Sequence, residues 1–252
     1  MNRRNVLLAL AALGCCIPAH AELYEVTMEP YGAGKRQLVS ANGSFAWDFS
    51  SGSEVFYNVR AVEHLWVEEG ALDPIYTHCV EIYQSVVPGN EYSFQTTAIE
   101  NIPERDSWPG PMGEQRAKLV EDLYANYVDP LTGGVYDTGL GSGVDLDDYA
   151  AAFQLMLWEI THENFAEGAD AFEMATQISF DFGAIQSEAD SSVFTVLDNM
   201  FLTLNDGFLD SANLEGWTNP DAQDQSRLVI PGAGTLTGLA FMIPMTRRRR
   251  RS

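Results

Sequence analysis

The sequence predicts an α+β domain, built as an antiparallel β-sandwich or open barrel with helices inserted into it. Its first half alternates short Val-, Phe- and Tyr-rich runs with clusters of Gly, Ser, Pro and Asn. Apolar residues at helical spacing begin near Glu114, and a strand-like run returns at the end. Strands, then inserted helices, then strands again are typical of an α+β domain.

The expected strands of the first half are short and aromatic. They are FAWDF from residue 45, VFYNVRAV from 55, HLWVEE from 64, HCVEIYQSVV from 78 and YSFQTTAI from 92. The intervening SSGS and VPGNE are typical of turns between antiparallel strands. Residues 102–113, IPERDSWPGPMG, contain three prolines and are expected to form a connection.

Helical periodicity dominates the second half. The expected elements are a helix at 116–128, a loop at 129–143, a helix carrying Gln154, a strand at 172–182, a helix at 191–204 and a strand at 221–230. Asp145, Asp147 and Asp148 supply an acidic first turn that suits the dipole of the Gln154 helix. A Ca²⁺ site there is an alternative, although the spacing lacks the Gly and closing Glu of an EF-hand loop.

The N-terminus predicts export. Residues 1–21 combine Arg3 and Arg4, the apolar run VLLALAALGCCI and the small-residue pattern AHA, which together predict a signal peptide that signal peptidase removes. A lipoprotein site with an acylated Cys15 is the alternative.

The C-terminus predicts a sorting or transmembrane signal over residues 228–252. Its apolar run from Leu228 to Met245 is near the shortest length that crosses a bilayer, and the following arginines would stay cytoplasmic. This segment resembles the PEP-CTERM sorting signals of Gram-negative bacteria, through Ile230, Pro231, Arg247, Arg248, Arg249, Arg250 and Arg251. The resemblance implies transient membrane insertion, cleavage by an exosortase and release to the cell surface or matrix. A simple C-terminal anchor is the alternative.

Between these ends, residues 22–227 are expected to form a single acidic domain. Residues 22–226 hold all 36 Asp and Glu and only six Lys or Arg, a charge of about −30. Such a charge makes nucleic acid a poor partner. No motif for a cofactor, a metal or a catalytic triad is recognisable, so the sequence does not predict an enzyme, and a hydrolase that uses some of the carboxylates has no motif behind it.

Two residues of this domain raise a chemical question. Cys79 is the single cysteine expected after removal of Cys15 and Cys16, and a lone thiol in an oxidising compartment is inert, paired between chains or chemically committed. Gln154 lies in a helix that is apolar on almost every side. An unpaired buried carboxamide costs about 1–3 kcal/mol, so Gln154 must either be hydrogen-bonded or react.

The stretches YTHCVEI and FQLMLWEI resemble the internal-thioester domains of bacterial surface proteins. In that family a Cys on a strand joins the side chain of a Gln at the start of a helix. The resemblance implies a thioester-domain-like fold and a crosslink between Cys79 and Gln154. The residues expected to support this pocket are Phe153, Leu157, Trp158, Glu81 and Glu159.

The resemblance implies a covalent adhesin. The Cys79 thiolate would attack the Gln154 carboxamide, ammonia would leave, and the thioester would later be opened by an amine on a surface or matrix molecule. His78 and His162 are expected to be bystanders, with His78 on the opposite sheet face from Cys79. The alternative is a non-covalent structural protein of a biofilm matrix with an inert, buried Cys79.

Overall fold

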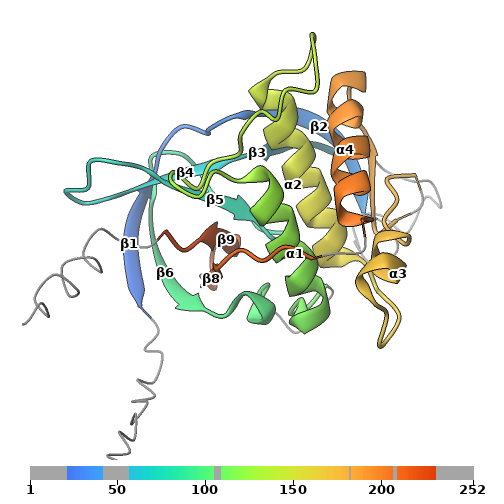
Figure 1. The fold of residues 1–252 in the computed structure, drawn as a ribbon. Helices are drawn as coiled ribbons and strands as arrows, with labels where there is room; N and C mark the ends of the chain where they lie inside the picture. The colour runs from blue at the N-terminus through green and yellow to red at the C-terminus, as the bar shows by residue number, and fades with distance from the viewer. Residues whose placement is uncertain (1–21, 42–56, 105–108, 182, 207–208, 231–252) are drawn as a thin grey trace, which may run out of the picture.

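The computed structural model describes residues 22–41, 57–104, 109–181, 183–206 and 209–230. A closed six-stranded antiparallel barrel is joined to a three-stranded sheet, and the helices gather on the side of that sheet (Figure 1). The predicted α+β class with antiparallel sheets is confirmed, and the barrel is closed where a sandwich or an open barrel was expected.

Both predicted export signals fall largely outside this part of the chain. The expected signal peptide, residues 1–21, and the C-terminal segment from residue 231 onward are not described. Within the described ranges, no helix has both the length and the apolar character needed to cross a bilayer.

The barrel runs in the order β1-β4-β5-β9-β8-β6 and closes because β1 pairs with both β4 and β6. Its strands are β1 Leu23–Met28, β4 His64–Glu68, β5 Ile75–Cys79, β6 Glu91–Thr97, β8 Leu214–Thr218 and β9 Gln225–Leu228. The rings of Trp66, Phe94 and Trp217 pack with centroids 5.1 and 5.4 Å apart in a buried cluster of these strands. Large aromatic burial of this kind supplies much of the barrel's stability.

The second sheet carries the helical layer. It contains β2 Gly34–Ala41, β3 Tyr57–Val62 and β7 Ile185–Glu188, in the order β3-β2-β7. The helices are α1 Gly113–Tyr127, α2 Leu146–His162, α3 Ala171–Ala175 and α4 Ser191–Leu204, with a 3-10 turn η1 at Ile99–Asn101. Helix α2 packs on this sheet, on α1 and α4, and on β5 of the barrel.

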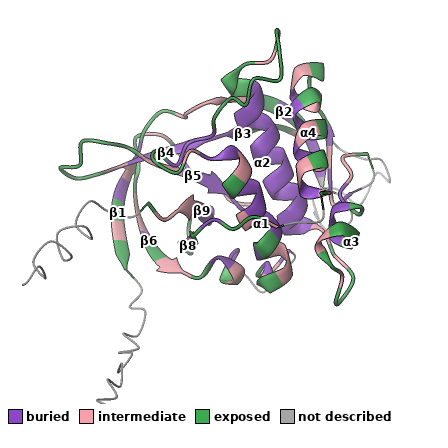
Figure 2. Ribbon diagram, in the orientation of Figure 1, coloured by how far each residue is buried: buried purple, intermediate pink, exposed green. Residues whose placement is uncertain are grey.

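Helix α2 is the centre of the domain. Every residue from Asp148 to His162 is buried, as Figure 2 shows, so the expected lack of a solvent face is confirmed. The helix begins with a capping box in which Asp145 and Asp148 each accept the other's backbone N–H at 3.0 Å. Asp148 also pairs with Lys35 and accepts a hydrogen bond from Ser192. The acidic first turn therefore caps the helix and holds β2 and α4 to it.

Several predicted elements differ from the structure. Residues 172–182 were expected to be a strand, but Asp170 and Glu173 form a capping box that starts α3 there. The expected strand from residue 78 ends at Cys79. Strands β1, β2, β7 and β8 were not predicted. The predicted FAWDF strand lies outside the described residues, whereas the helices at 116–128 and 191–204 and the loop at 129–143 are confirmed.

Gly34 provides a sharp test of the contact between β2 and β3. Its φ is +135°, and a Cβ there would lie 2.5 Å from the Val62 Cα and closer still to the Ala61 carbonyl oxygen. We expect Gly34→Ala to lower the free energy of unfolding by about 2–4 kcal/mol, because the main chain itself must move. Urea denaturation followed by circular dichroism measures this loss.

Gly70→Ala is the matched control for Gly34. Gly70 also has a positive φ, +84°, but a Cβ there meets nothing within 4 Å. Its substitution should cost only the backbone strain, about 1 kcal/mol. Equal losses in the two variants would contradict the close approach of β2 to β3.

Candidate functional site

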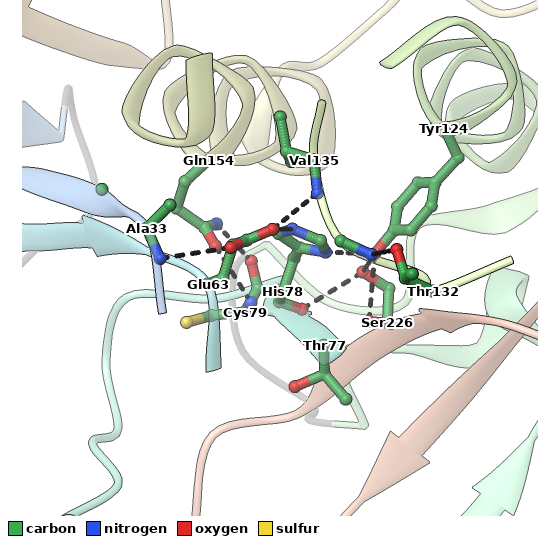
Figure 3. A network of polar contacts seen from close by, with 12 residues as sticks. Ala33, Glu63, Thr77, His78, Cys79, Tyr124, Thr132, Val135, Gln154 and Ser226 are labelled. Atoms are coloured by element: carbon green, nitrogen blue, oxygen red, sulfur yellow. Dashed lines mark hydrogen bonds and ion pairs between the residues drawn. The ribbon is translucent and has the colours of Figure 1, made fainter. Parts of the chain in front are cut away.

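The structure brings Cys79 and Gln154 together. The Cys79 backbone N–H donates to Gln154 Oε1 at 3.2 Å, and Gln154 Nε2 donates to the Cys79 carbonyl oxygen at 2.7 Å (Figure 3). Cys79 is the last residue of β5, and both side chains are buried. Gln154 lies in the middle of α2, not at the helix start that the resemblance implied, because the helix begins at Leu146.

These two bonds satisfy the carboxamide of Gln154. Its oxygen accepts one hydrogen bond and its nitrogen donates one. These two hydrogen bonds offset the free-energy cost of burying the carboxamide. The carbonyl carbon of Gln154 lies between these two atoms. It is therefore held against the main chain of the one residue in the described domain that carries a thiol.

The sulfur of Cys79 contacts His64, a histidine that no motif in the sequence indicates. Cys79 Sγ lies 3.5 Å from His64 Nε2 and 3.6 Å from His64 Nδ1. Burial raises the pKa of the Cys79 thiol well above its usual range, and burial lowers the pKa of His64 to about 4. At neutral pH the contact therefore joins a neutral thiol to a neutral imidazole.

His64 belongs to a buried chain of hydrogen bonds inside the barrel. His64 Nδ1 lies 3.0 Å from Gln225 Oε1, which also accepts from Thr77 Oγ1 at 2.9 Å. The indole Nε1 of Trp66 donates to Thr77 Oγ1 at 2.7 Å. His64 and Thr77 are paired across β4 and β5, so the strand register decides this contact. Without the register, nothing in HLWVE separates this histidine from an ordinary core residue.

A pocket of about 230 Å³ adjoins the sulfur. Cys79, His64 and Trp158 line it, together with Tyr31, Arg60 and Gln223 among others. The Arg60 guanidinium lies over the Tyr31 ring, 4.7 Å from its centroid. The pocket offers space for a small group beside Cys79, with a mixed aromatic, aliphatic and polar lining that includes the charged Arg60.

The predicted supporting residues do not all lie beside Cys79. Trp158 lines the pocket beside Cys79. Phe153 packs on His78, with ring centroids 4.5 Å apart, and Leu157 is part of the main hydrophobic core. Glu81 accepts a hydrogen bond from the Asp224 backbone N–H at 3.3 Å, so it connects the chain after β5 to the residues before β9.

Glu159 does not orient Cys79 or Gln154 as expected. Its two carboxyl oxygens accept hydrogen bonds from the backbone N–H groups of Ile185 at 2.6 Å and Ser179 at 3.2 Å. Glu159 therefore anchors the start of β7 to α2. Burial raises its pKa to about 8, although these two hydrogen bonds act in the opposite direction.

The two histidines expected to be bystanders are held by other partners. His78 Nδ1 lies 3.0 Å from the Tyr124 hydroxyl, which in turn donates to the Ser226 carbonyl oxygen at 3.0 Å (Figure 3). His162 Nδ1 lies 2.7 Å from the Trp158 carbonyl oxygen. Burial lowers the pKa of His78 to about 3.

No group of three or more His, Cys, Asp or Glu side chains in the described ranges is placed to hold a metal ion. The three aspartates at the start of α2, for which Ca²⁺ was an alternative, are divided among other roles. Asp145 and Asp148 cap the helix, and Asp147 accepts a hydrogen bond from the Gly34 backbone N–H at 3.0 Å.

No protein-family model and no curated protein matches the chain. Among solved structures, the chain is similar to the N-terminal domain of the Streptococcus pyogenes pilus tip adhesin Cpa. The two share 13% sequence identity at a TM-score of 0.41, over 80% of this chain and 99% of that one. A likeness at that TM-score assigns neither family nor function, so any function for this chain must be argued from its own residues.

Proposed function

We propose that this chain is an exported surface or matrix protein that attaches covalently to amine-bearing molecules through a thioester between Cys79 and Gln154. One observation carries the proposal: both the oxygen and the nitrogen of the Gln154 carboxamide are hydrogen-bonded to the main chain of Cys79, in the buried centre of the domain. Such an attachment occurs once and is not a turnover, so the protein is proposed to be an adhesin and not an enzyme.

The chemistry depends on contact between the two side chains. In water an amide is more stable than a thioester, so the fold must hold sulfur and carbonyl carbon together. Effective molarities of about 10⁵ M or more are available to groups oriented in this way. Escape of ammonia makes the step hard to reverse. Leu155, Leu157 and Trp158 are buried. Their apolar side chains would exclude the water that otherwise hydrolyses a thioester.

The pocket beside Cys79 supplies a route for the incoming amine. A primary amine on a lysine or a polyamine would enter this space of about 230 Å³, which Cys79 lines and Gln154 does not, and would approach the acyl carbon from the side of Cys79. The acidic body raises the local concentration of such cations. Lys35, one of the chain's few own amines, pairs with Asp145 and Asp148 and does not compete.

Export and release complete the proposed function. Signal peptidase would remove residues 1–21, and an exosortase would recognise the segment that begins at Ile230 and Pro231. The protein would then reside at the cell surface or in the matrix of a Gram-negative bacterium. A measured C-terminus near Pro231 in secreted material supports this processing, and an intact arginine tail in that material contradicts it.

The second candidate function is a non-covalent structural component of a biofilm matrix, on the same fold. It is favoured by the carboxamide of Gln154, whose two hydrogen bonds already satisfy a structural glutamine. In this case Cys79 is a small buried core residue.

The intact mass of freshly purified protein separates the two functions. The covalent function predicts a mass lower by one ammonia than the sequence requires, and a gain of one methylamine after incubation with that amine. An unshifted mass, with a Cys79 thiol that alkylates fully once the protein is unfolded, supports the structural function instead.

A further inference from the structure

The contact between Cys79 and His64 has a direction that the surrounding hydrogen bonds determine. Thr77 Oγ1 accepts a hydrogen bond from Trp66 Nε1, which can only donate. Thr77 in turn donates its hydroxyl proton to Gln225 Oε1, which can only accept. The Gln225 amide is oriented independently, because its Nε2 donates to the Gln223 carbonyl oxygen at 3.1 Å. Gln225 Oε1 is therefore an acceptor on both sides.

This acceptor selects the tautomer of His64. Because Gln225 Oε1 cannot donate, the proton of the neutral imidazole must reside on His64 Nδ1. His64 Nε2 then carries the free lone pair of the ring, and Cys79 Sγ lies 3.5 Å from it and 3.6 Å from the protonated Nδ1. The barrel thus presents a neutral proton acceptor to the one thiol in the described chain.

We propose that His64 is the proton carrier of the Cys79–Gln154 thioester, a role that rests on the covalent function proposed above. In formation, His64 Nε2 takes the thiol proton as Cys79 Sγ bonds to the carbonyl carbon of Gln154. The C–N bond breaks, and His64 returns the proton to the leaving nitrogen, which departs as ammonia.

Opening of the thioester uses the same carrier in the other direction. The nitrogen of the incoming amine bonds to the acyl carbon of Gln154 and loses one proton to His64. The C–S bond then breaks, and His64 returns that proton to the Cys79 sulfur. Protons balance in both directions, and no oxidant or second cofactor is required.

Burial makes this carrier necessary. The raised pKa of Cys79 leaves almost no thiolate at neutral pH, and the lowered pKa of His64 keeps its Nε2 unprotonated, so the proton is transferred while the C–S bond forms and not beforehand. His64 is buried in the same site and lines the same pocket, where both the thiol and an incoming amine can reach it. His78, next to Cys79 in sequence, is bonded to Tyr124 instead.

The test compares His64→Gln with His78→Gln in the full chain. Each protein is purified in denaturant with its carboxamide intact and then refolded, and the loss of ammonia is followed by intact mass. We expect His64→Gln to lose ammonia at least roughly 100-fold more slowly than the wild type, because a positioned base contributes that much. His78→Gln, a matched buried histidine, should react within a few-fold of the wild type.

Rescue by an added base separates proton transfer from packing. His64→Ala opens space beside the pocket, and added imidazole should restore ammonia loss. Pyrazole, a far weaker base of the same size, should not restore it. Circular dichroism confirms which variants have refolded, and if His64→Ala does not refold, His64→Gln against His78→Gln decides the proposal.

The outcomes distinguish this proposal from the function on which it rests. If the wild type loses ammonia and His64→Gln does so at the same rate, or if both histidine variants are slowed equally, the role of His64 is overturned while the thioester stands. If the wild type never loses ammonia, the covalent function fails and the role of His64 fails with it.

Discussion

Cys79→Ala is expected to abolish covalent uptake of methylamine completely, and its intact mass should equal the mass its sequence requires. The reason is that the thioester needs the sulfur, and no other thiol lies in the described domain. Ala also keeps the two main-chain groups to which Gln154 is bonded, so the carboxamide should stay in place. Mass spectrometry with and without methylamine measures both signs.

Gln154→Glu is the complementary variant. The introduced carboxylic acid, when protonated, retains an acceptor for the Cys79 N–H and a donor for its carbonyl oxygen, but it has no ammonia to release. We expect no mass loss and no amine uptake. Uptake in either variant would place the reactive bond elsewhere in the chain and would contradict the Cys79–Gln154 assignment.

The second large effect expected is a loss of stability as the pH rises from 6.5 to about 8. Burial raises the pKa of Glu159 to about 8 from its ordinary 4.5. Between these values the folded protein retains a proton that the unfolded chain has lost, so the free energy of unfolding falls as the pH increases. Above 6.5 the unfolded chain loses the remaining half proton from each of the buried histidines His64 and His78, whose pKa values are lowered on folding, so each opposes this fall by only about 0.4 kcal/mol.

The expected fall due to Glu159 is about 2 kcal/mol across that interval. Burial raises the pKa of Asp224 to about 7, which adds to the fall in its lower part. Urea denaturation at several pH values measures the slope. Glu159→Gln should flatten it, whatever its effect on absolute stability, because the replaced group no longer titrates. An unchanged slope in this variant would contradict the assignment to Glu159.

Local signals in the sequence were sufficient for the helices. The apolar spacing of 116–128 and 191–204 and the aspartates before α2 act within a few residues, and the structure has helices there. The same local logic failed at 172–182, because the capping pair of Asp170 and Glu173 outweighs the strand-like composition. It also missed β1, β2, β7 and β8, each of which has at least one pairing partner far away in the sequence.

The site residues likewise differ in whether local sequence or tertiary contacts identify them. Cys79 and Gln154 could be singled out in the sequence as a lone cysteine and a carboxamide in an apolar helix, and their pairing was implied by the resemblance of YTHCVEI and FQLMLWEI to internal-thioester domains. Their contact joins residues 75 positions apart and depends on how α2 packs against the end of β5. His64 could not be selected, since its nearness to the sulfur exists only after β4 and β5 have paired in one register.

Composition and local pattern were thus enough to establish the charge of the body, the α+β class, the positions of the long helices and the two residues of interest. Closure of the barrel, the position of Gln154 in mid-helix, the role of Glu159 at β7 and the base beside Cys79 came from packing. The physical reason is that capping and periodicity are properties of neighbouring residues, whereas strand register and buried contacts depend on groups that meet when the whole chain has folded.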